Sequence, residues 1–326
     1  MSHHPPSPTP RPAVRPLLAI GVAILAVSTA SIFIRFAQEQ APSLVIAAYR
    51  LSLATLILAP FSLAHHRPEI RQLLSRRTTL WLVVGSGVLL AFHFATWITS
   101  LQYTTVASSV VLVSTSPLWV ALASPLLLRE PLPAPVRLGM AITLIGGAVV
   151  GVSDSCQWVS TGLSCPSLSS FLAGKAFIGD LLALSGALFA SGYLLIGRRL
   201  RPSVSLPAYT FLVYGIAAAV LLGIVAIAGQ SLVGYPWLTY LLFLALALIP
   251  QLVGHSTFNW ALRYLSAAYV SITLLGEPVG STALAYAILG EIPSAFKLVG
   301  LALILAGIVV ASKSGEQKKP VTGVAG

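Results

Sequence analysis

The sequence predicts an all-α membrane protein with ten transmembrane helices, arranged as two inverted five-helix repeats. Three observations predict this fold. Hydrophobic residues make up 56% of the 326 positions and charged residues only 8%, whereas roughly a quarter of the residues in soluble domains are charged. Apolar stretches of membrane-spanning length recur along the chain, and the second half repeats the first at a constant offset.

Ten apolar segments meet or approach the ~20 residues that a helix needs to cross the hydrocarbon core of a bilayer. Because lipid offers no hydrogen-bond partners, every backbone amide in such a segment has to be satisfied internally. The segments are too long and too evenly apolar for the alternating strands of a membrane barrel, so helices are expected. They lie at residues 16–36, 43–64, 80–100, 104–128, 135–153, 178–198, 206–229, 237–260, 266–289 and 295–312.

Turn residues and charges separate these segments in order. In the first half, residues 38–42 end the first segment, the basic stretch 65–77 ends the second, and residues 129–131 end the fourth. In the second half, residues 198–202 follow the sixth segment and residues 290–293 follow the ninth. Each break combines Pro or Gly with charged or polar side chains, which is typical of loops outside the hydrocarbon core.

The halves are joined and flanked by segments without apolar helices. The joining loop contains both cysteines, Cys156 and Cys165, and their spacing leaves open both a disulfide and two unpaired thiols. The expected organisation is a disordered tail, the first repeat, an external loop, the second repeat and a disordered basic tail, at residues 1–16, 17–153, 154–177, 178–312 and 313–326.

The basic residues predict the orientation. Fifteen of the 19 Lys and Arg residues lie on the side of the two termini, and only Arg35, Arg50, Lys175 and Lys297 lie on the other. Cytoplasmic loops carry an excess of Lys and Arg, so both termini are expected in the cytoplasm. The net charge of +11 is spread between apolar segments and not gathered in one patch, which argues against a nucleic-acid partner.

The internal repeat has an offset of 161 residues. Tyr103 lands on Tyr264, Pro117 on Pro278, and Glu130 on Glu291. Two tandem units of five helices, an odd number, insert with opposite orientation. Inverted repeats recur in secondary transporters, where the substrate binds at mid-membrane between the halves.

Three stretches of the sequence resemble the drug/metabolite transporter superfamily, specifically members with two EamA-type domains. They are residues 117–130 (PLWVALASPLLLRE), 277–291 (EPVGSTALAYAILGE) and 255–264 (HSTFNWALRY). The resemblance implies a ten-helix fold with a central cavity between the halves, in a family that exports amino acids and other metabolites and also contains importers. The chain departs from the family pattern at Ser116-Pro117, where no Glu-Pro pair stands.

Glu277 is the one acid near the middle of an expected span. A carboxyl group there is costly and usually faces a cavity or a partner. It is a candidate for proton coupling or cation binding, because burial in a low dielectric favours its protonated form. The alternative is a protonated side chain that caps carbonyl groups left free by Pro278. Pro117 and Pro278 are candidate hinges, with a static kink as the alternative.

Polar and aromatic side chains within the spans are candidates for a substrate cavity. His93 and Trp97 are four residues apart, as are His255 and Asn259, so each pair shares a helix face. The two histidines miss the repeat offset by one residue, about 100° of helix rotation. A neutral histidine bonded to a neighbouring helix is an equal alternative. The candidate cavity residues are His93, Trp97, Ser116, Tyr193, His255, Asn259 and Glu277.

Arg50 lies in the second expected helix, about two turns from its outer end. It could contact an anion, extend outward to the interface, or pair with Glu39, and the last two roles are favoured. Arg35 is expected to pair with Glu39, four residues later.

The expected function is secondary transport of a small amino acid-like or drug-like metabolite by alternating access. Export is favoured, and a proton is the candidate coupling ion. The alternatives are an intramembrane enzyme, or a channel or scaffold without active transport. No clustered catalytic side chains, metal-ligand set or nucleotide-binding loop is present in the sequence. We expect no cofactor, a location in the cell membrane, a small-molecule substrate and the lipid bilayer as partners, and a monomer or homodimer.

Overall fold

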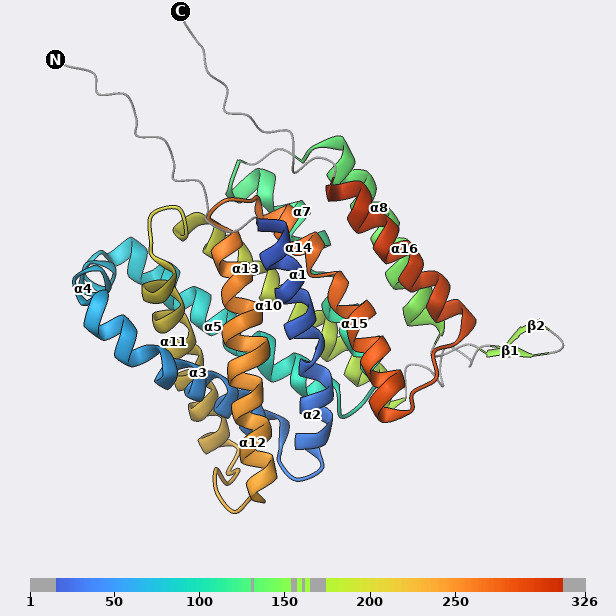
Figure 1. The fold of residues 1–326 in the computed structure, drawn as a ribbon, viewed down its shortest axis with the longest axis horizontal. Helices are drawn as coiled ribbons and strands as arrows, with labels where there is room; N and C mark the ends of the chain where they lie inside the picture. Colours follow the sequence, from blue (N-terminus) through green and yellow to red (C-terminus); the bar gives the residue numbers. More distant parts are fainter. Residues whose placement is uncertain (1–15, 130–131, 154–156, 160–161, 165–173, 313–326) are drawn as a thin grey trace, which may run out of the picture.

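The computed structural model describes residues 16–129, 132–153, 157–159, 162–164 and 174–312. Within these residues, eight helices are long and apolar enough to cross a membrane. Two shorter apolar helices, α8 (Ala134–Ser153) and α16 (Ala295–Ser312), bring the set to the ten segments that the sequence predicts. The predicted all-α membrane fold is confirmed, and Figure 1 shows the bundle that the helices form.

The first repeat begins with a span divided at Thr29 and contains a short helix between its second and third spans. Its elements are α1 (Pro16–Ser28), α2 (Ala30–Gln38), α3 (Ser43–His65), α4 (Arg67–Ser75), α5 (Arg77–Ser100), α6 (Val106–Val113), α7 (Ser116–Leu127) and α8.

The second repeat follows the same order and contains two π-helical stretches, η1 and η2. Its elements are α10 (Lys175–Leu200), α11 (Leu206–Ile227), α12 (Trp237–Leu246), η1 (Ala247–His255), α13 (Ser256–Ala261), α14 (Ala267–Thr273), α15 (Gly276–Leu284), η2 (Ala285–Leu289) and α16.

The segment between the repeats contains a small antiparallel hairpin that the sequence did not indicate. Strand β1 (Gln157–Val159) pairs with β2 (Gly162–Ser164), with Val159 opposite Gly162. Cys156 and Cys165, whose pairing was left open, lie outside the described residues.

Hydroxyl side chains fix the same helix start in both repeats. Thr105 precedes α6 and accepts a hydrogen bond from the Ser108 amide at 3.2 Å. Ser266 precedes α14 and accepts one from the Tyr269 amide, also at 3.2 Å. Such N-caps satisfy an amide that has no partner inside the helix. Thr105 and Ser266 are 161 residues apart, which is the offset of the repeat. Both repeats therefore begin this helix with the same kind of hydroxyl N-cap.

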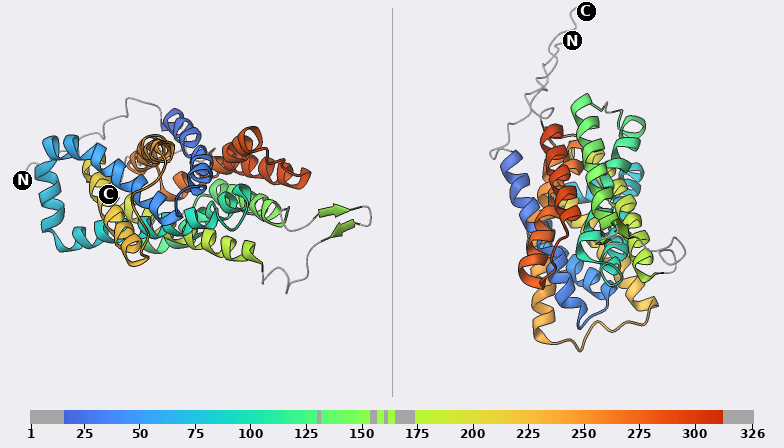
Figure 2. Two further views of the ribbon diagram at one scale, coloured as in Figure 1. Left: turned by 90° about the horizontal axis from the view of Figure 1, so that it is seen from below. Right: turned by 90° about the vertical axis from the view of Figure 1, so that its right-hand side faces the viewer.

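Each half packs its helices against the other half in a reciprocal way. The first span of the second repeat, α10, packs along α5, and the first span of the first repeat packs along η1 and α12. The second spans, α3 and α11, pack on one another, as do the last spans, α8 and α16. Figures 1 and 2 both show α8 and α16 side by side. This exchange of equivalent partners places the interface between the halves at the centre of the bundle.

Glycines allow α8 and α16 to approach one another closely. A Cβ atom added at Gly146 would lie 2.6 Å from the Gly300 carbonyl oxygen, and one added at Gly307 would lie 2.5 Å from the Gly139 carbonyl oxygen. Gly146 and Gly307 are therefore close-packing positions in this helix pair. Small residues stabilise membrane helix pairs by allowing such backbone contact.

We expect Gly146→Ala to destabilise the protein by about 1–3 kcal/mol, because the new methyl group forces α8 away from α16. The measurement is the free energy of unfolding in mixed micelles. The matched control is Gly223→Ala on α11, where nothing lies within 4 Å of the added Cβ atom. Equal stability of the two variants would contradict the close contact.

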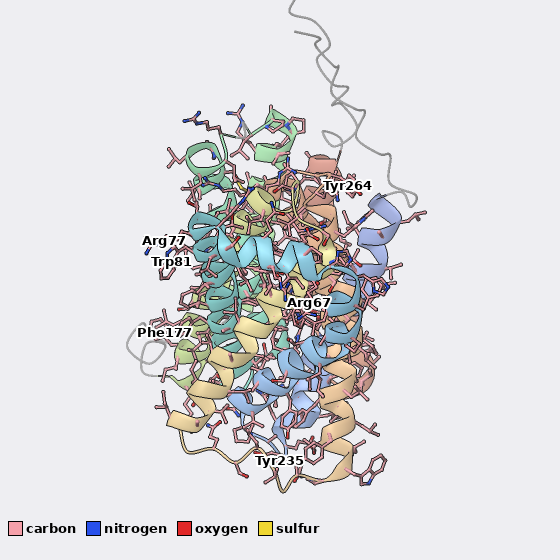
Figure 3. The ribbon with its side chains drawn as sticks, turned by 90° about the vertical axis from the view of Figure 1, so that its left-hand side faces the viewer. Arg67, Arg77, Trp81, Phe177, Tyr235 and Tyr264 are labelled. Atoms are coloured by element: carbon pink, nitrogen blue, oxygen red, sulfur yellow. The ribbon has the colours of Figure 1, made fainter. Side chains whose placement is uncertain are left out.

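The two ends of the bundle are marked by tyrosines. Figure 3 shows Tyr264 near one end and Tyr235 at the other, and we name the ends after them. The Tyr264 end is the one that the distribution of Lys and Arg predicts to be cytoplasmic. Helix α4 connects α3 and α5 at this end and lies crosswise to the long helices (Figure 3).

Candidate functional site

Two spans that meet at the centre of the protein are broken, one in each repeat. Helix α6 ends at Val113 and α7 begins at Ser116, while α14 ends at Thr273 and α15 begins at Gly276. Pro117 and Pro278 therefore lie in the first turn after a break and not within a continuous helix. Proline is tolerated at the start of a helix, where its missing amide leaves no bond unmade. The sequence placed both prolines at mid-span but did not predict the breaks.

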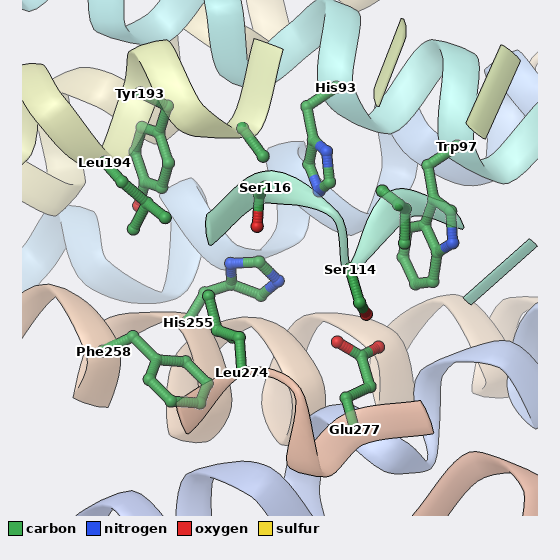
Figure 4. A pocket seen from close by; sticks show the side chains of 12 residues that line it. His93, Trp97, Ser114, Ser116, Tyr193, Leu194, His255, Phe258, Leu274 and Glu277 are labelled. Carbon is green, nitrogen blue, oxygen red and sulfur yellow. The ribbon is translucent and has the colours of Figure 1, made fainter. Parts of the chain in front are cut away.

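A cavity of about 50 Å³ lies beside the breaks and is lined from both halves. Six of the seven residues that the sequence proposed for a cavity line it, and Figure 4 shows all six around one space. They are His93, Trp97 and Ser116 from the first repeat, and Tyr193, His255 and Glu277 from the second. The other lining residues are Val113, Ser114, Ala190, Leu194, Phe258 and Leu274.

Asn259, the seventh proposed residue, lies behind this wall and is buried. Its amide nitrogen donates to the Tyr193 hydroxyl and to the His255 carbonyl oxygen at 2.9 Å. It also lies 3.5 Å from the Tyr214 hydroxyl, which in turn is 3.2 Å from the Ser256 hydroxyl. Asn259 thus holds two cavity residues in position without lining the cavity.

The two histidines face one another across the halves, with ring centroids 6.3 Å apart. His93 Nδ1 lies 2.9 Å from the Gly186 carbonyl oxygen. Because a carbonyl only accepts, Nδ1 carries the proton and Nε2 is left as an acceptor. The His93 ring stacks on the Trp97 ring with an interplanar angle of 10°. His255 ends the π-helix η1. The 100° rotation expected between the positions of His93 and His255 assumed α-helical geometry, so it does not apply there.

Glu277 presents the one acidic side chain among the cavity-lining residues. Figure 4 shows the Ser114 hydroxyl pointing toward its carboxyl group. Between described residues, this carboxyl group forms no ion pair within 4 Å. The Ser28 hydroxyl lies 3.5 Å from the Glu277 backbone oxygen, and the Ser281 hydroxyl donates to the Ser28 carbonyl oxygen at 3.2 Å. These two contacts hold α15 against α1.

Arg50 differs from the favoured sequence interpretation. It does not extend to the interface, and it does not pair with Glu39, because its side chain is 0% exposed. Its Nε donates to Oε1 of Gln251 at 2.8 Å, and its guanidinium carbon lies 4.2 Å from the centroid of the Phe94 ring. The sequence favoured an outward side chain or a pair with Glu39, but tertiary packing points the side chain into the protein.

Arg35 also has partners other than the one expected. Its Nη1 donates to the Leu101 carbonyl oxygen at 2.8 Å, and its Nη2 lies 3.8 Å from a carboxyl oxygen of Glu291. The predicted pair with Glu39 was therefore wrong. Since Arg35 belongs to the first repeat and Glu291 to the second, this contact ties the halves together at the Tyr235 end.

A second tie joins the halves at the Tyr264 end. Glu69 of α4 accepts the Ser205 backbone amide at 2.6 Å and the Ser205 hydroxyl at 2.5 Å, and it pairs with His66 at 3.2 Å. Burial alone raises the pKa of Glu69, but the hydrogen bonds from Ser205 and His66 outweigh it and hold the pKa below the usual 4.5. The carboxyl group is therefore ionised at neutral pH.

The described residues contain no group of three or more His, Cys, Asp or Glu side chains that could hold a metal ion. Sequence reasoning missed Ser114 and the apolar lining residues. Ser114 had one signal, its place three residues before a mid-span proline. Leu194, Phe258 and Leu274 had none, because hydropathy does not distinguish a cavity-facing from a lipid-facing apolar side chain.

Comparison with known proteins agrees with this architecture. The family model described as "EamA-like transporter family" matches residues 15–152 and 177–313. The chain is 22% identical to "Uncharacterized transporter YyaM" of Bacillus subtilis (strain 168) over 271 residues, which are 82% of this chain and 83% of that protein. A solved structure described only as "Crystal structure of protein" is similar with a TM-score of 0.68 and 21% identity, over 93% of this chain and 98% of the other.

Proposed function

The chain belongs to the EamA-like transporter family, and from that membership we propose that it is a secondary transporter that moves a small metabolite by alternating access between its two halves. The observation that carries the proposal is the cavity, which lies at the meeting point of the two broken spans and is lined from both repeats. In transporters built from inverted repeats, substrate binds at the repeat interface, where helices are discontinuous.

The lining suits an organic molecule with an apolar body and a few polar groups. Trp97, Phe258 and Leu274 supply apolar surface, while Glu277 and the histidines supply polar atoms. The Trp97 indole N–H is buried without a hydrogen-bond partner among the described residues. A few convergent polar groups in an apolar pocket are typical of small-molecule sites. We therefore propose an amino acid-like or drug-like substrate.

The size of the cavity supports a conformational cycle. A space of about 50 Å³ holds a few water molecules and is too small for a metabolite. Both ends of the interface are tied, by Arg35 with Glu291 and by Glu69 with Ser205. We propose that these ties break in turn, so that the cavity widens first toward one end and then toward the other, with the breaks before Pro117 and Pro278 as hinges.

We further propose that the protein lies in the cell membrane with both termini in the cytoplasm, that it exports its substrate, and that Glu277 couples transport to protons. Its partners would be the small-molecule substrate and surrounding lipid, and it would act as a monomer or homodimer. An intramembrane enzyme or a channel is the rival function. An enzyme would convert its substrate chemically, and a channel would not concentrate it.

Transport into proteoliposomes tests the proposal. The purified protein is reconstituted and offered a panel of labelled amino acids and small cationic and aromatic drugs, with and without a pH gradient. We expect accumulation of at least one compound, unchanged in structure, above its external concentration when the gradient is imposed. Chemical conversion would favour an enzyme, and entry that stops at equal concentrations under every gradient would favour a channel.

A further inference from the structure

Arg50 stands out because it is a buried cation inside a membrane span that forms no ion pair within 4 Å with any described residue. Its side chain is 0% exposed, and it begins about 10 Å inside α3, counted at 1.5 Å per residue from Ser43. A charged side chain at this depth is costly, and it normally pairs with a group of opposite charge or faces a cavity. Among the described residues, neither Glu277 nor any other acid forms an ion pair with it.

Two donor groups of the Arg50 guanidinium have no partner among the described residues. Nε is satisfied by Oε1 of Gln251, but Nη1 and Nη2 are buried without a hydrogen-bond partner among the described residues. The orientation of the Gln251 amide is fixed chemically, since only its oxygen can accept from Nε. Two unsatisfied donor groups therefore lie side by side on one guanidinium, and only a group that accepts hydrogen bonds can satisfy them.

The free donors have the geometry of a carboxylate site. With Nε occupied, the guanidinium offers its Nη1 and Nη2 edge, whose planar fork matches the two oxygens of a carboxylate. One face of the guanidinium is covered by the Phe94 ring, at 4.2 Å from the guanidinium carbon to the ring centroid. This contact fixes the plane of the group.

Aromatic side chains lie between Arg50 and the cavity. The Phe94 ring meets the His255 ring edge-on at 5.3 Å, and His255 lines the cavity. Electrostatic interactions also connect the guanidinium to Glu277 and Tyr214. A chain of polar contacts runs from Gln251 through Ser256, Tyr214 and Asn259 to Tyr193 at the cavity wall. A turn of the Phe94 and His255 rings would open a path from the cavity to the guanidinium.

We propose that Arg50 and Gln251 form an anion site that binds a carboxylate group of the transported molecule. The inference rests on the proposed transport function and deepens it, because it assigns a negatively charged oxygen group to the substrate. A carboxylate satisfies the free donors and neutralises the buried cation, so its binding favours the conformation in which the cavity has widened. An inorganic anion such as chloride would use the same donors, and the test below separates the two sources.

The test compares two isosteric probes, phenylacetate and phenylacetamide, which differ in the charge of one group. Binding to the purified full-length protein is measured by calorimetry and thermal shift at neutral pH, in buffer without chloride. We expect the wild type to bind phenylacetate about tenfold or more tightly than phenylacetamide, as expected for two charge-assisted hydrogen bonds. Arg50→Gln should abolish this preference, and Arg50→Lys, which keeps the charge without the fork, should retain only part of it.

Two further variants keep the test decisive if Arg50→Gln fails to fold. Gln251→Glu places a carboxylate beside the guanidinium, so it should raise the melting temperature and abolish the phenylacetate preference. Arg201→Lys is the matched control, because Arg201 is also buried but donates to the carbonyl oxygens of Asn259 and Val204. It should keep the wild-type preference.

The proposal is overturned if the wild type binds both probes equally or neither, or if the preference survives in both Arg50→Gln and Gln251→Glu. Stabilisation by chloride that equals that by phenylacetate would show an inorganic anion site and overturn the assignment to the substrate. Failure of the transport function can be told apart from failure of the anion site. If the protein prefers phenylacetate in binding but shows no flux into proteoliposomes, the transport function is contradicted and the anion site is not.

Discussion

Glu277→Gln should abolish transport driven by a pH gradient while leaving exchange of substrate across the membrane. Glutamine has nearly the shape of a protonated glutamate, so the cavity keeps its size and its hydrogen-bonding capacity. It cannot release or take up a proton, however, so a gradient no longer changes the charge of the site. Flux driven by the gradient should fall to the level of liposomes without protein, and counterflow between labelled and unlabelled substrate should continue.

The physical reason is the position of Glu277 in the fold. It lines the cavity immediately after the break in the ninth span, where the halves meet, and it has no ion pair within 4 Å among the described residues. A carboxyl group in such an environment is stable when neutral and costly when charged. It can become charged when water or substrate reaches the opened cavity, which links protonation to the conformational cycle.

The matched control for this prediction is Glu39→Gln, since Glu39 is exposed and lies at the C-terminal end of α2. Its flux should equal that of the wild type with and without the gradient. Glu277→Asp adds a second readout, because it keeps the titratable group and should therefore keep a dependence on the gradient. Flux of Glu277→Gln that follows the gradient as in the wild type would eliminate Glu277 as the coupling group.

The sequence predicted those features of the protein that depend on hydropathy and local spacing. The ten spans follow from apolar length, and the two repeats follow from Tyr103, Pro117 and Glu130, which recur at one offset. Glu277 could be singled out because an acid is rare at mid-span. The structure places six of the seven proposed cavity residues around one space, but their role in binding stays a prediction.

What could not be predicted depends on how helices rotate and pack. The side chain of a single Arg two turns inside a span can point outward or inward. For Arg50 the inward direction depends on Gln251, which lies on another helix and accepts its hydrogen bond. The rule for residues four apart favoured Glu39 for Arg35, but Glu291 from the other half is the actual partner. The π-helix η1 changes the rotation of His255, and Pro250 within it indicates a distorted helix without distinguishing a π-helix from a simple kink.

Cross-linking the two halves at the Tyr235 end should stop transport. Arg35→Cys and Glu291→Cys are combined in a protein whose Cys156 and Cys165 are replaced by serine. A direct disulfide requires Cα atoms within about 7 Å of one another. Because Arg35 and Glu291 meet through the ends of two long side chains, their Cα atoms are farther apart, and a thiol-reactive reagent with a reducible spacer is used instead. Since Arg35 and Glu291 lie in contact across the interface, the linked protein should be unable to open this end.

The control places both thiols within the first half, at Arg35 and Gln102, because the Arg35 side chain already reaches the carbonyl group of the neighbouring Leu101. This link joins two segments of the first repeat, so it should form equally well and leave flux unchanged when the repeats are the moving units. Reduction of the spacer should restore flux in the Arg35–Glu291 protein. Full flux in that protein while it is cross-linked would mean that the halves do not separate at the Tyr235 end, and that substrate enters and leaves by another route.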